Sequence, residues 1–212
     1  MRMVLGTTRR RRGRPRQELA GFSQTREQLI RAGLAAMTEK GYAVTGIDEI
    51  LTSVNVPKGS FYHYFGSKEG FGAELIDRYA EYFARKLDRF FLNEGRPPLQ
   101  RLRDFVKDAE AGMARHHFKR GCLVGNLGQE MNALPKAFRV RLIDVLDDWQ
   151  DSTARCLEAA KRAGQISKKA DTKQLAAFFW IGWEGAVLRA KLERNAQPLA
   201  IFADGFFASI EG

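Results

Sequence analysis

The sequence predicts an all-α protein with an N-terminal three-helix helix-turn-helix head and a larger C-terminal helical body. Apolar residues recur at three- and four-residue intervals from about residue 25 onward, which is the spacing of helices that bury one face. No segment shows the alternation of apolar and polar residues that is typical of a strand. We expect three parts: a flexible basic arm over residues 1–21, the head over residues 22–67 and the body over residues 68–212.

The first helix is predicted to begin at Thr25 and to end before Gly41. Thr25 and Gln28 have the spacing of a capping box, in which the hydroxyl and the amide each bind a free backbone N–H. Gly41 is expected to end the helix, because glycine adopts the left-handed conformation without a steric clash.

Two short helices and a tight turn are predicted between residues 47 and 65. Thr45 with Asp48 is expected to cap the first of them in a second capping box. Asn55 tolerates the left-handed conformation that the turn needs, and Pro57 is preset for the first turn of the next helix. This order of elements is typical of a helix-turn-helix.

Longer helices are predicted for the rest of the chain. Ser67 is expected to cap the first of them, and residues 95–98 are expected to form a linker. Further helices are predicted at residues 99–117, 121–131, 135–163, 172–194 and 198–210. A body of this length can bury a substantial apolar core.

The positive charge of the chain is concentrated at its N-terminus. The 212 residues carry a net charge of +10, and residues 1–16 contain seven arginines and no acid. The rest of the chain therefore carries only about +3, obtained as +10 minus +7. A basic tail on a nearly neutral globule favours an anionic polymer or surface as partner.

Hydropathy and cysteine spacing indicate the compartment. The sequence has no run of 18 apolar residues and no apolar segment of signal-peptide type behind its N-terminal arginines, so we expect neither a membrane span nor secretion. Cys122 and Cys156 match no zinc or CxxC spacing. A cytoplasmic location fits these features.

The stretch VPKGSFYHYFGSKEGF, residues 56–71, is the most informative part of the sequence. In a helix that starts near Pro57, Phe61 and Phe65 lie one turn apart and would enter the core. Polar groups that can bind base edges and phosphates are left on the other flank, and a major groove about 12 Å wide accepts such a helix. These groups belong to Lys58, Ser60, Tyr62 and His63. Helix-turn-helix shapes also occur as plain packing motifs, but the basic arm favours DNA.

This stretch resembles the DNA-binding head of TetR-family transcription regulators. Its signature, G-[S/T]-[F/L]-Y-x-[Y/H]-F-x-x-K, is found here from Gly59 to Lys68. The resemblance implies an all-α homodimer that binds double-stranded palindromic operator DNA and carries a ligand-binding body. The roles that it implies are base-edge contacts for Lys58, Gly59, Ser60 and His63, and phosphate contacts for Tyr62, Tyr64, Lys68 and the cap residue Thr45. Gly46 and Asn55 depart from the family pattern, where a second hydroxyl and a glycine are usual.

The segment RGRPR within the arm resembles the core of an AT-hook. A narrow A·T minor groove concentrates negative potential, which attracts inserted arginines. Arg12, Arg14 and Arg16 are the candidates. The alternative is a cationic tail that adds salt-dependent affinity without sequence preference.

A dimer interface is predicted from the last two helices. Gly182 and Ala186 belong to a stripe of small residues that would let another helix approach, and Phe202 and Phe206 lie on one face of the following helix. Two such helices from each subunit would form a four-helix interface. The dimer would place two recognition helices about 34 Å apart, which suits successive major grooves. The alternative is packing within one chain.

Cys122 is the sharpest candidate for a sensor in the body. The nearby cations of His116, His117, Lys119 and Arg120 would lower the pKa of its thiol and raise its reactivity, whereas a buried cysteine would serve as a small apolar residue. Other candidates for an effector pocket are Phe118, Asn126, Trp149 and Trp183, with His116, His117, Gln129 and Glu184 as further polar anchors. The segment GCLVGN resembles a TetR subgroup that includes the N-ethylmaleimide-reductase repressor and the acrylate-utilisation regulator. This likeness implies an electrophile or a small unsaturated acid as effector.

The motifs of the main enzyme classes are missing from the sequence. No metal-binding spacing, glycine-rich phosphate loop or nucleophile motif is found, so we expect neither catalysis nor a cofactor. The sequence predicts a homodimeric regulator, expected to be a repressor, that a small molecule releases from DNA. Its rivals are an effector-independent architectural DNA-binding protein and an enzyme.

Overall fold

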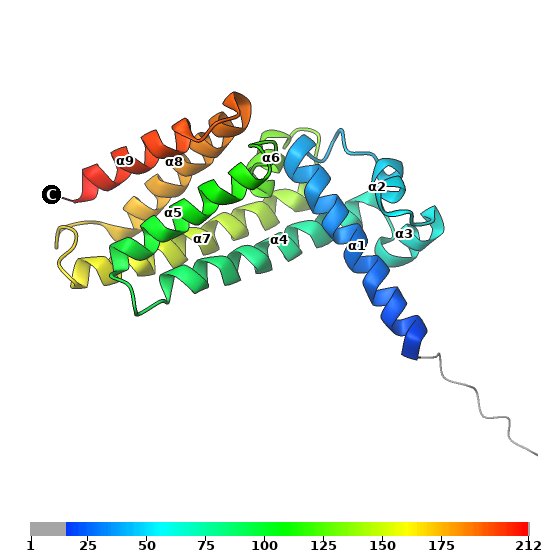
Figure 1. Ribbon diagram of the computed structural model, residues 1–212, viewed down its shortest axis with the longest axis horizontal. Coiled ribbons are helices and arrows are strands. Elements are labelled where there is room, and N and C mark those ends of the chain that lie inside the picture. Colours follow the sequence, from blue (N-terminus) through cyan, green and yellow to red (C-terminus); the bar gives the residue numbers. More distant parts are fainter. Residues whose placement is uncertain (1–15, 212) are drawn as a thin grey trace, which may run out of the picture.

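The computed structural model describes the backbone of residues 16–211 and the side chains of residues 24–211. This part of the chain forms nine helices and no strand, which confirms the all-α prediction. The helices α1 to α3 form a head at one end, α4 runs from the head into the body, and α8 and α9 lie along one edge of the body (Figure 1). The helices are α1 (Arg16–Lys40), α2 (Ile47–Val54), α3 (Lys58–Phe65), α4 (Lys68–Phe91), α5 (Pro98–Arg115), α6 (Leu123–Gln129), α7 (Lys136–Arg162), α8 (Thr172–Glu193) and α9 (Gln197–Ile210).

The turn and the core under α3 follow the sequence prediction. Asn55 adopts the left-handed conformation, with φ of 53°, between α2 and α3. Phe61 is fully buried, and the centroid of its ring lies 5.0 Å from that of Phe71. The Phe71 ring also packs against Phe65, at 4.7 Å between centroids. The Ser67 hydroxyl caps α4 by accepting a hydrogen bond from a backbone N–H 2.9 Å away. The head is therefore held by an aromatic cluster beneath the exposed face of α3.

One predicted helix start and one predicted helix cap are wrong. The first helix begins at Arg16 rather than Thr25, so residues 16–21 are helical instead of part of a flexible arm. The segment RQELA consists of good helix formers, which extends the helix past the capping box. Thr45 does not cap α2, because its hydroxyl donates to the Gly41 carbonyl at 2.5 Å and Gly46 is the N-cap residue. Pro57 is the N-cap residue of α3 and lies just before its first turn.

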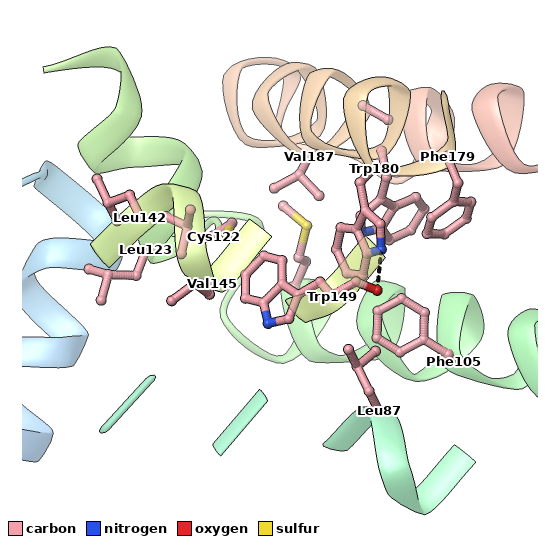
Figure 2. Packing of buried hydrophobic residues seen from close by; sticks show 14 of the residues in the cluster. Leu87, Phe105, Cys122, Leu123, Leu142, Val145, Trp149, Phe179, Trp180 and Val187 are labelled. Carbon is pink, nitrogen blue, oxygen red and sulfur yellow. Dashed lines mark hydrogen bonds between the residues drawn. The ribbon is translucent and has the colours of Figure 1, made fainter. Parts of the chain in front are cut away.

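The helices of the body match the prediction to within two residues at each end, and Gly164 follows α7 with φ of 71°. An aromatic cluster forms their core (Figure 2). The Trp149 ring lies 4.8 Å from that of Trp180 and 4.3 Å from that of Phe83. The indole N–H of Trp180 donates to the Trp149 carbonyl at 3.1 Å and to the Thr153 hydroxyl at 2.9 Å. Trp149 is thus a core residue.

The small-residue stripe of α8 packs against α9 of the same chain. The Phe202 ring lies so close to Gly182 that a Cβ there would overlap it, and Ala186 and Phe206 are buried. Gly182, Phe202 and Phe206 therefore join α8 to α9 within one chain. The two helices also carry large exposed apolar residues, namely Phe178, Ile181, Leu188, Leu192 and Ile201.

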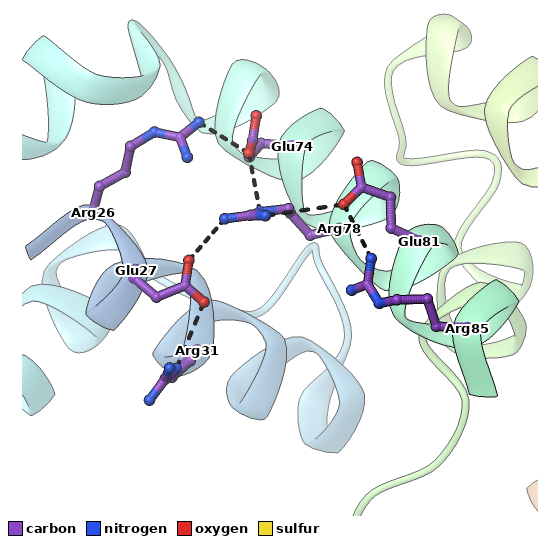
Figure 3. Close-up of polar contacts among 7 residues, drawn as sticks. All are labelled: Arg26, Glu27, Arg31, Glu74, Arg78, Glu81 and Arg85. Carbon is purple, nitrogen blue, oxygen red and sulfur yellow. Dashed lines mark hydrogen bonds and ion pairs between the residues drawn. The ribbon is translucent and has the colours of Figure 1, made fainter. Parts of the chain in front are cut away.

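An ion-pair network joins α1 to α4 (Figure 3). Arg26 lies 2.9 Å from Glu74, and Arg78 lies 2.8 Å from Glu27, with nitrogen-to-oxygen distances in both cases. Arg78 also approaches Glu74 at 3.5 Å, so its guanidinium bridges the two helices. Exposed pairs of this kind contribute at most about 1 kcal/mol each. The network therefore links α1 to α4 but adds little to stability.

Candidate DNA-binding surface and effector cavity

The outer face of α3 carries the polar residues that the sequence singled out. Lys58, Gly59, Tyr62 and His63 are exposed, and Ser60 is half-buried. A Cβ added to Gly59 would meet no described atom within 4 Å, so the protein itself leaves room for a side chain there. The packing of the protein itself therefore does not require a glycine here, whereas a partner that approaches this face closely would. This geometry suits a recognition helix in a groove.

Lys58 is engaged by a carboxylate in the free protein. Its Nζ lies 3.0 Å from a carboxylate oxygen of Asp48 on α2, and the hydrogen bond and charge of Asp48 raise the lysine pKa. Asp48 therefore competes with a base or a phosphate for this ammonium. The sequence prediction missed this partner, which lies ten positions earlier on another helix.

Two of the predicted phosphate contacts have structural roles in the head. Lys68 Nζ lies 4.6 Å from the centre of the Tyr42 ring and donates to the Ala43 carbonyl at 3.3 Å. Thr45 is fully buried, so its hydroxyl is not presented to a phosphate. Tyr64 is half-buried on the flank of α3. Arg12, Arg14 and the side chain of Arg16 lie outside the described residues.

A cavity of about 380 Å³ lies between α1, α4, α5, the start of α6 and α8. Its inner wall is largely apolar and includes Leu34, Tyr79, Phe83, Met113, Trp183 and Val187. Basic side chains from three separate segments also line it, namely Arg31, Lys86, Arg115, His116 and Arg120. Glu184 is the only acid among the described residues that line the cavity. The volume and composition suit a small ligand with an apolar body and a negative charge.

Cys122 lies in the wall of this cavity, but its surroundings are not those of a reactive thiol. Burial and the nearby Glu184 raise the pKa of the thiol well above its ordinary value. The prediction of a lowered pKa is therefore wrong, because burial and the neighbouring acid both disfavour the thiolate. The thiol also accepts a long hydrogen bond of 3.5 Å from the Gly125 N–H at the start of α6.

Glu184 and His116 both have shifted pKa values. Burial raises the pKa of the Glu184 carboxyl to about 7, and its hydrogen bond with Cys122 offsets only part of this effect. Desolvation, followed by the charges of Arg120 and Arg115, lowers the pKa of His116. Near neutral pH the cavity therefore holds a partly protonated carboxyl opposite a rim of permanent positive charge.

Only two of the five predicted effector residues line this cavity, namely Cys122 and Trp183. Trp149 is in the core, and the Phe118 carbonyl accepts a hydrogen bond from Arg194 at 3.1 Å. The Asn126 amide donates to the carbonyls of Met37 and Thr38 at the end of α1, at 3.0 and 2.8 Å. Two of the further predicted anchors, His116 and Glu184, also line the cavity, as does Arg120. Arg31, Lys86 and Arg115 were missed because they come from distant segments, and no local spacing identifies them.

Residues 24–211 contain no group of three or more His, Cys, Asp or Glu side chains arranged to hold a metal ion. No described helix combines the length and the apolar content that a bilayer crossing needs.

The chain matches known regulators over most of its length. Residues 29–75 match "Bacterial regulatory proteins, tetR family", and residues 98–206 match "Tetracyclin repressor-like, C-terminal domain". It is 56% identical over 196 residues to the transcriptional regulator AcuR of Cereibacter sphaeroides, and this alignment covers 92% of this chain and 89% of that protein. It is 30% identical over 176 residues to the HTH-type transcriptional repressor NemR of Escherichia coli, and this alignment covers 82% of this chain and 88% of that protein.

A solved structure supports the same assignment. The crystal structure of regulatory protein TetR from Rhodobacter sphaeroides aligns with a TM-score of 0.86 and 56% identity, over 87% of this chain and 98% of that chain. The resemblance that the sequence signature carried is thereby confirmed. The chain belongs to the TetR family and is a bacterial transcription regulator.

Proposed function

We propose that the protein is a cytoplasmic homodimeric repressor that leaves its palindromic operator when a small carboxylic acid occupies the cavity. The observation that carries this proposal is the cavity of about 380 Å³, with an apolar inner wall and a basic rim formed by Arg31, Arg115 and Arg120. A carboxylate would be drawn to the rim, and its carbon skeleton would lie against Tyr79 and Trp183.

The chemistry of Cys122 favours reversible binding over covalent capture. A thiol reacts as its thiolate, and burial together with Glu184 disfavours that form here. The surroundings of Cys122 therefore favour an unsaturated acid that binds reversibly over an electrophile that the thiolate would have to attack. A Cys122→Ser protein should still release DNA when acrylate is added. If that variant failed to release DNA while the wild type released it, the thiol would be part of the mechanism.

The dimer is supported by the exposed apolar face of α8 and α9. Phe178, Ile181, Leu188 and Leu192 follow one side of α8 at helical spacing, and Ile201 continues this face on α9. Exposed apolar areas of this kind mark interaction surfaces, and two copies of the helix pair would form a four-helix interface. These residues replace Gly182, Ala186, Phe202 and Phe206 as the proposed contacts between subunits.

The DNA contacts are supported by the outer face of α3, from Lys58 to His63. We assign direct base reading to Lys58, Gly59, Ser60 and His63, and phosphate contact to Tyr62 and Tyr64. Lys68, tied to Tyr42 and Ala43, is assigned the secondary role of supporting the segment before α2. Release follows if the occupied cavity favours a dimer whose two α3 helices no longer fit one face of the duplex.

Selection of bound sequences from random DNA, followed by titration of the complex with acrylate, tests the proposal. A palindromic consensus and a loss of operator affinity on addition of acrylate are expected. Equal affinity for random duplex and for the selected sequence would favour an architectural DNA-binding protein. Conversion of acrylate or of a quinone by the purified protein would favour an enzyme.

A further inference from the structure

Glu184 is an acid in the wall of the effector cavity. It lies on α8, and the other charged side chains that line the described cavity are basic. Burial raises the pKa of its carboxyl, and the hydrogen bond with Cys122 lowers it only in part. Within the described part of the chain, no arginine or lysine contributes to this pKa. Because an unpaired carboxylate in the interior is costly, the folded protein by itself disfavours the ionised form of Glu184.

The groups that face Glu184 from the neighbouring elements differ in whether they can gain a proton near neutral pH. Burial raises the pKa of Tyr79 on α4 and of Cys122 before α6, so both are already neutral and protonated. Lys191, which lines a separate small hollow with Glu184, has a pKa lowered by desolvation. The remaining groups are the basic side chains of the cavity. They are Arg31 on α1, Lys86 on α4, Arg115 on α5, and His116 and Arg120 between α5 and α6.

Among the basic groups that line the described cavity, His116 is the one with a proton to gain. A guanidinium is always protonated in proteins, and the Lys86 ammonium lies 2.7 Å from an Asp108 carboxylate oxygen. Desolvation and two neighbouring guanidinium groups lower the pKa of His116. Glu184 and His116 are therefore the two groups whose charge an occupant can change near neutral pH.

An anionic occupant brings a second negative charge close to Glu184. If spherical, a cavity of about 380 Å³ would be about 9 Å across, so a carboxylate inside it lies within roughly that distance of the wall. The occupant also displaces water, which removes part of the remaining hydration of Glu184. Repulsion and desolvation both favour the neutral form of this side chain. A simple carboxylic acid has a pKa of about 4, so the occupant itself is ionised near neutral pH.

We infer that Glu184 takes up one proton from solvent when a carboxylate occupies the cavity, so that effector binding is linked to pH. The proton is bound by a carboxylate oxygen of Glu184, and no other bond forms or breaks. This inference rests on the proposed function and adds its regulation, since a given concentration of acid then acts more strongly at lower pH. The rival is proton uptake by His116, which an anion would also favour.

Calorimetric titration of the full-length protein with acrylate measures this proton directly. The heats of binding in two buffers with different ionisation enthalpies give the number of protons that the complex takes up. Since the Glu184 pKa is about 7, the wild type should take up about 0.4 to 0.9 of a proton at pH 8 and less than about 0.2 at pH 6. The dissociation constant of acrylate should then rise about five- to tenfold from pH 6 to pH 8, for a pKa at least about one unit higher in the complex.

Three substitutions separate the groups. Glutamine keeps the shape of Glu184 without its charge, so Glu184→Gln should take up less than about 0.1 of a proton and bind acrylate at pH 8 about five- to tenfold more tightly than the wild type. Glu39→Gln is the matched control, because it removes the same charge from a residue that acts on His116 but is not among the described residues lining the cavity. Glu39→Gln and His116→Gln should both keep the proton uptake and the pH dependence of the wild type.

The outcomes separate this inference from the proposed function. If acrylate binds and releases the operator without proton uptake at pH 8, or if Glu184→Gln retains the uptake, the inference is overturned while the proposed function stands. Loss of the uptake in His116→Gln would assign the proton to His116 and overturn the inference in the same way. If acrylate neither binds the wild type nor releases the operator at either pH, the proposed function fails and the inference fails with it.

Circular dichroism shows whether Glu184→Gln is folded. If it is not, the wild type, His116→Gln and Glu39→Gln still decide between the two groups. Proton uptake that persists in all three supports Glu184, and its absence from the wild type or from His116→Gln overturns the inference.

Discussion

Replacement of Glu184 by glutamine should make the protein more stable at alkaline pH. Burial raises the Glu184 pKa to about 7 from its ordinary value of 4.5. Between these two values the folded state holds a proton that the unfolded state has lost, so the free energy of unfolding falls as pH rises. Glutamine resembles the protonated carboxyl and does not ionise, so the variant should escape this loss.

The magnitude follows from the two pKa values. Each unit of pKa difference corresponds to about 1.4 kcal/mol, so ionised Glu184 costs about 3 kcal/mol well above pH 7. At pH 5.5 Glu184 is still protonated in the folded protein but ionised in the unfolded chain. The free energy of unfolding has therefore fallen by only about 1.4 kcal/mol at this pH. The advantage of Glu184→Gln should therefore grow by about 2 kcal/mol between pH 5.5 and pH 8. This is an upper value, because part of the side chain meets solvent.

Urea unfolding at pH 5.5 and pH 8, at one protein concentration and ionic strength, measures this difference. Cys122 and Tyr79, which face Glu184, have raised pKa values and do not titrate in this range. Glu94→Gln, at an exposed position between α4 and α5, is the matched control and should show no such trend. A stability difference for Glu184→Gln that stays constant between the two pH values would refute the burial argument.

Three further outcomes are expected. Gly59→Ala should leave thermal stability unchanged or slightly raised, since a Cβ fits there, yet weaken operator binding about tenfold in a titration at fixed salt. Gly182→Leu should lower the free energy of unfolding by about 1–3 kcal/mol, because the added side chain overlaps Phe202, and unchanged urea unfolding would contradict this packing. Deletion of residues 1–15 should lower operator affinity and flatten its dependence on salt concentration, and an identical salt slope would show that the arginines contact no phosphate.

Much of the head could be predicted because its determinants are local. Asn55 at the turn, Ser67 at the start of α4 and Phe61 under α3 each act within a few residues of their own position. Thr45 was misassigned because a capping box and an inward hydroxyl have the same sequence pattern. The hydroxyl instead donates to the Gly41 carbonyl, four residues earlier in the link between α1 and α2.

The cavity could not be assembled from the sequence, because its residues meet only in the folded chain. Arg31 comes from α1, Arg120 from the segment before α6 and Glu184 from α8. The cations near Cys122 in the sequence suggested a lowered pKa for its thiol. The fold instead places the thiol in the interior beside Glu184, where desolvation raises that pKa.

The sequence by itself determined the helices, the exposed polar face of α3 and the family, because helical periodicity, turn chemistry and a compact motif are properties of neighbouring residues. The tertiary structure decided which face of α8 is inside. This helix is apolar on every side. Periodicity therefore cannot tell whether the side with Gly182 and Ala186 or the side with Phe178 and Ile181 faces the interior. The Phe202 ring settles the choice, because it fits only against the side that lacks a Cβ at Gly182 and leaves the larger residues exposed.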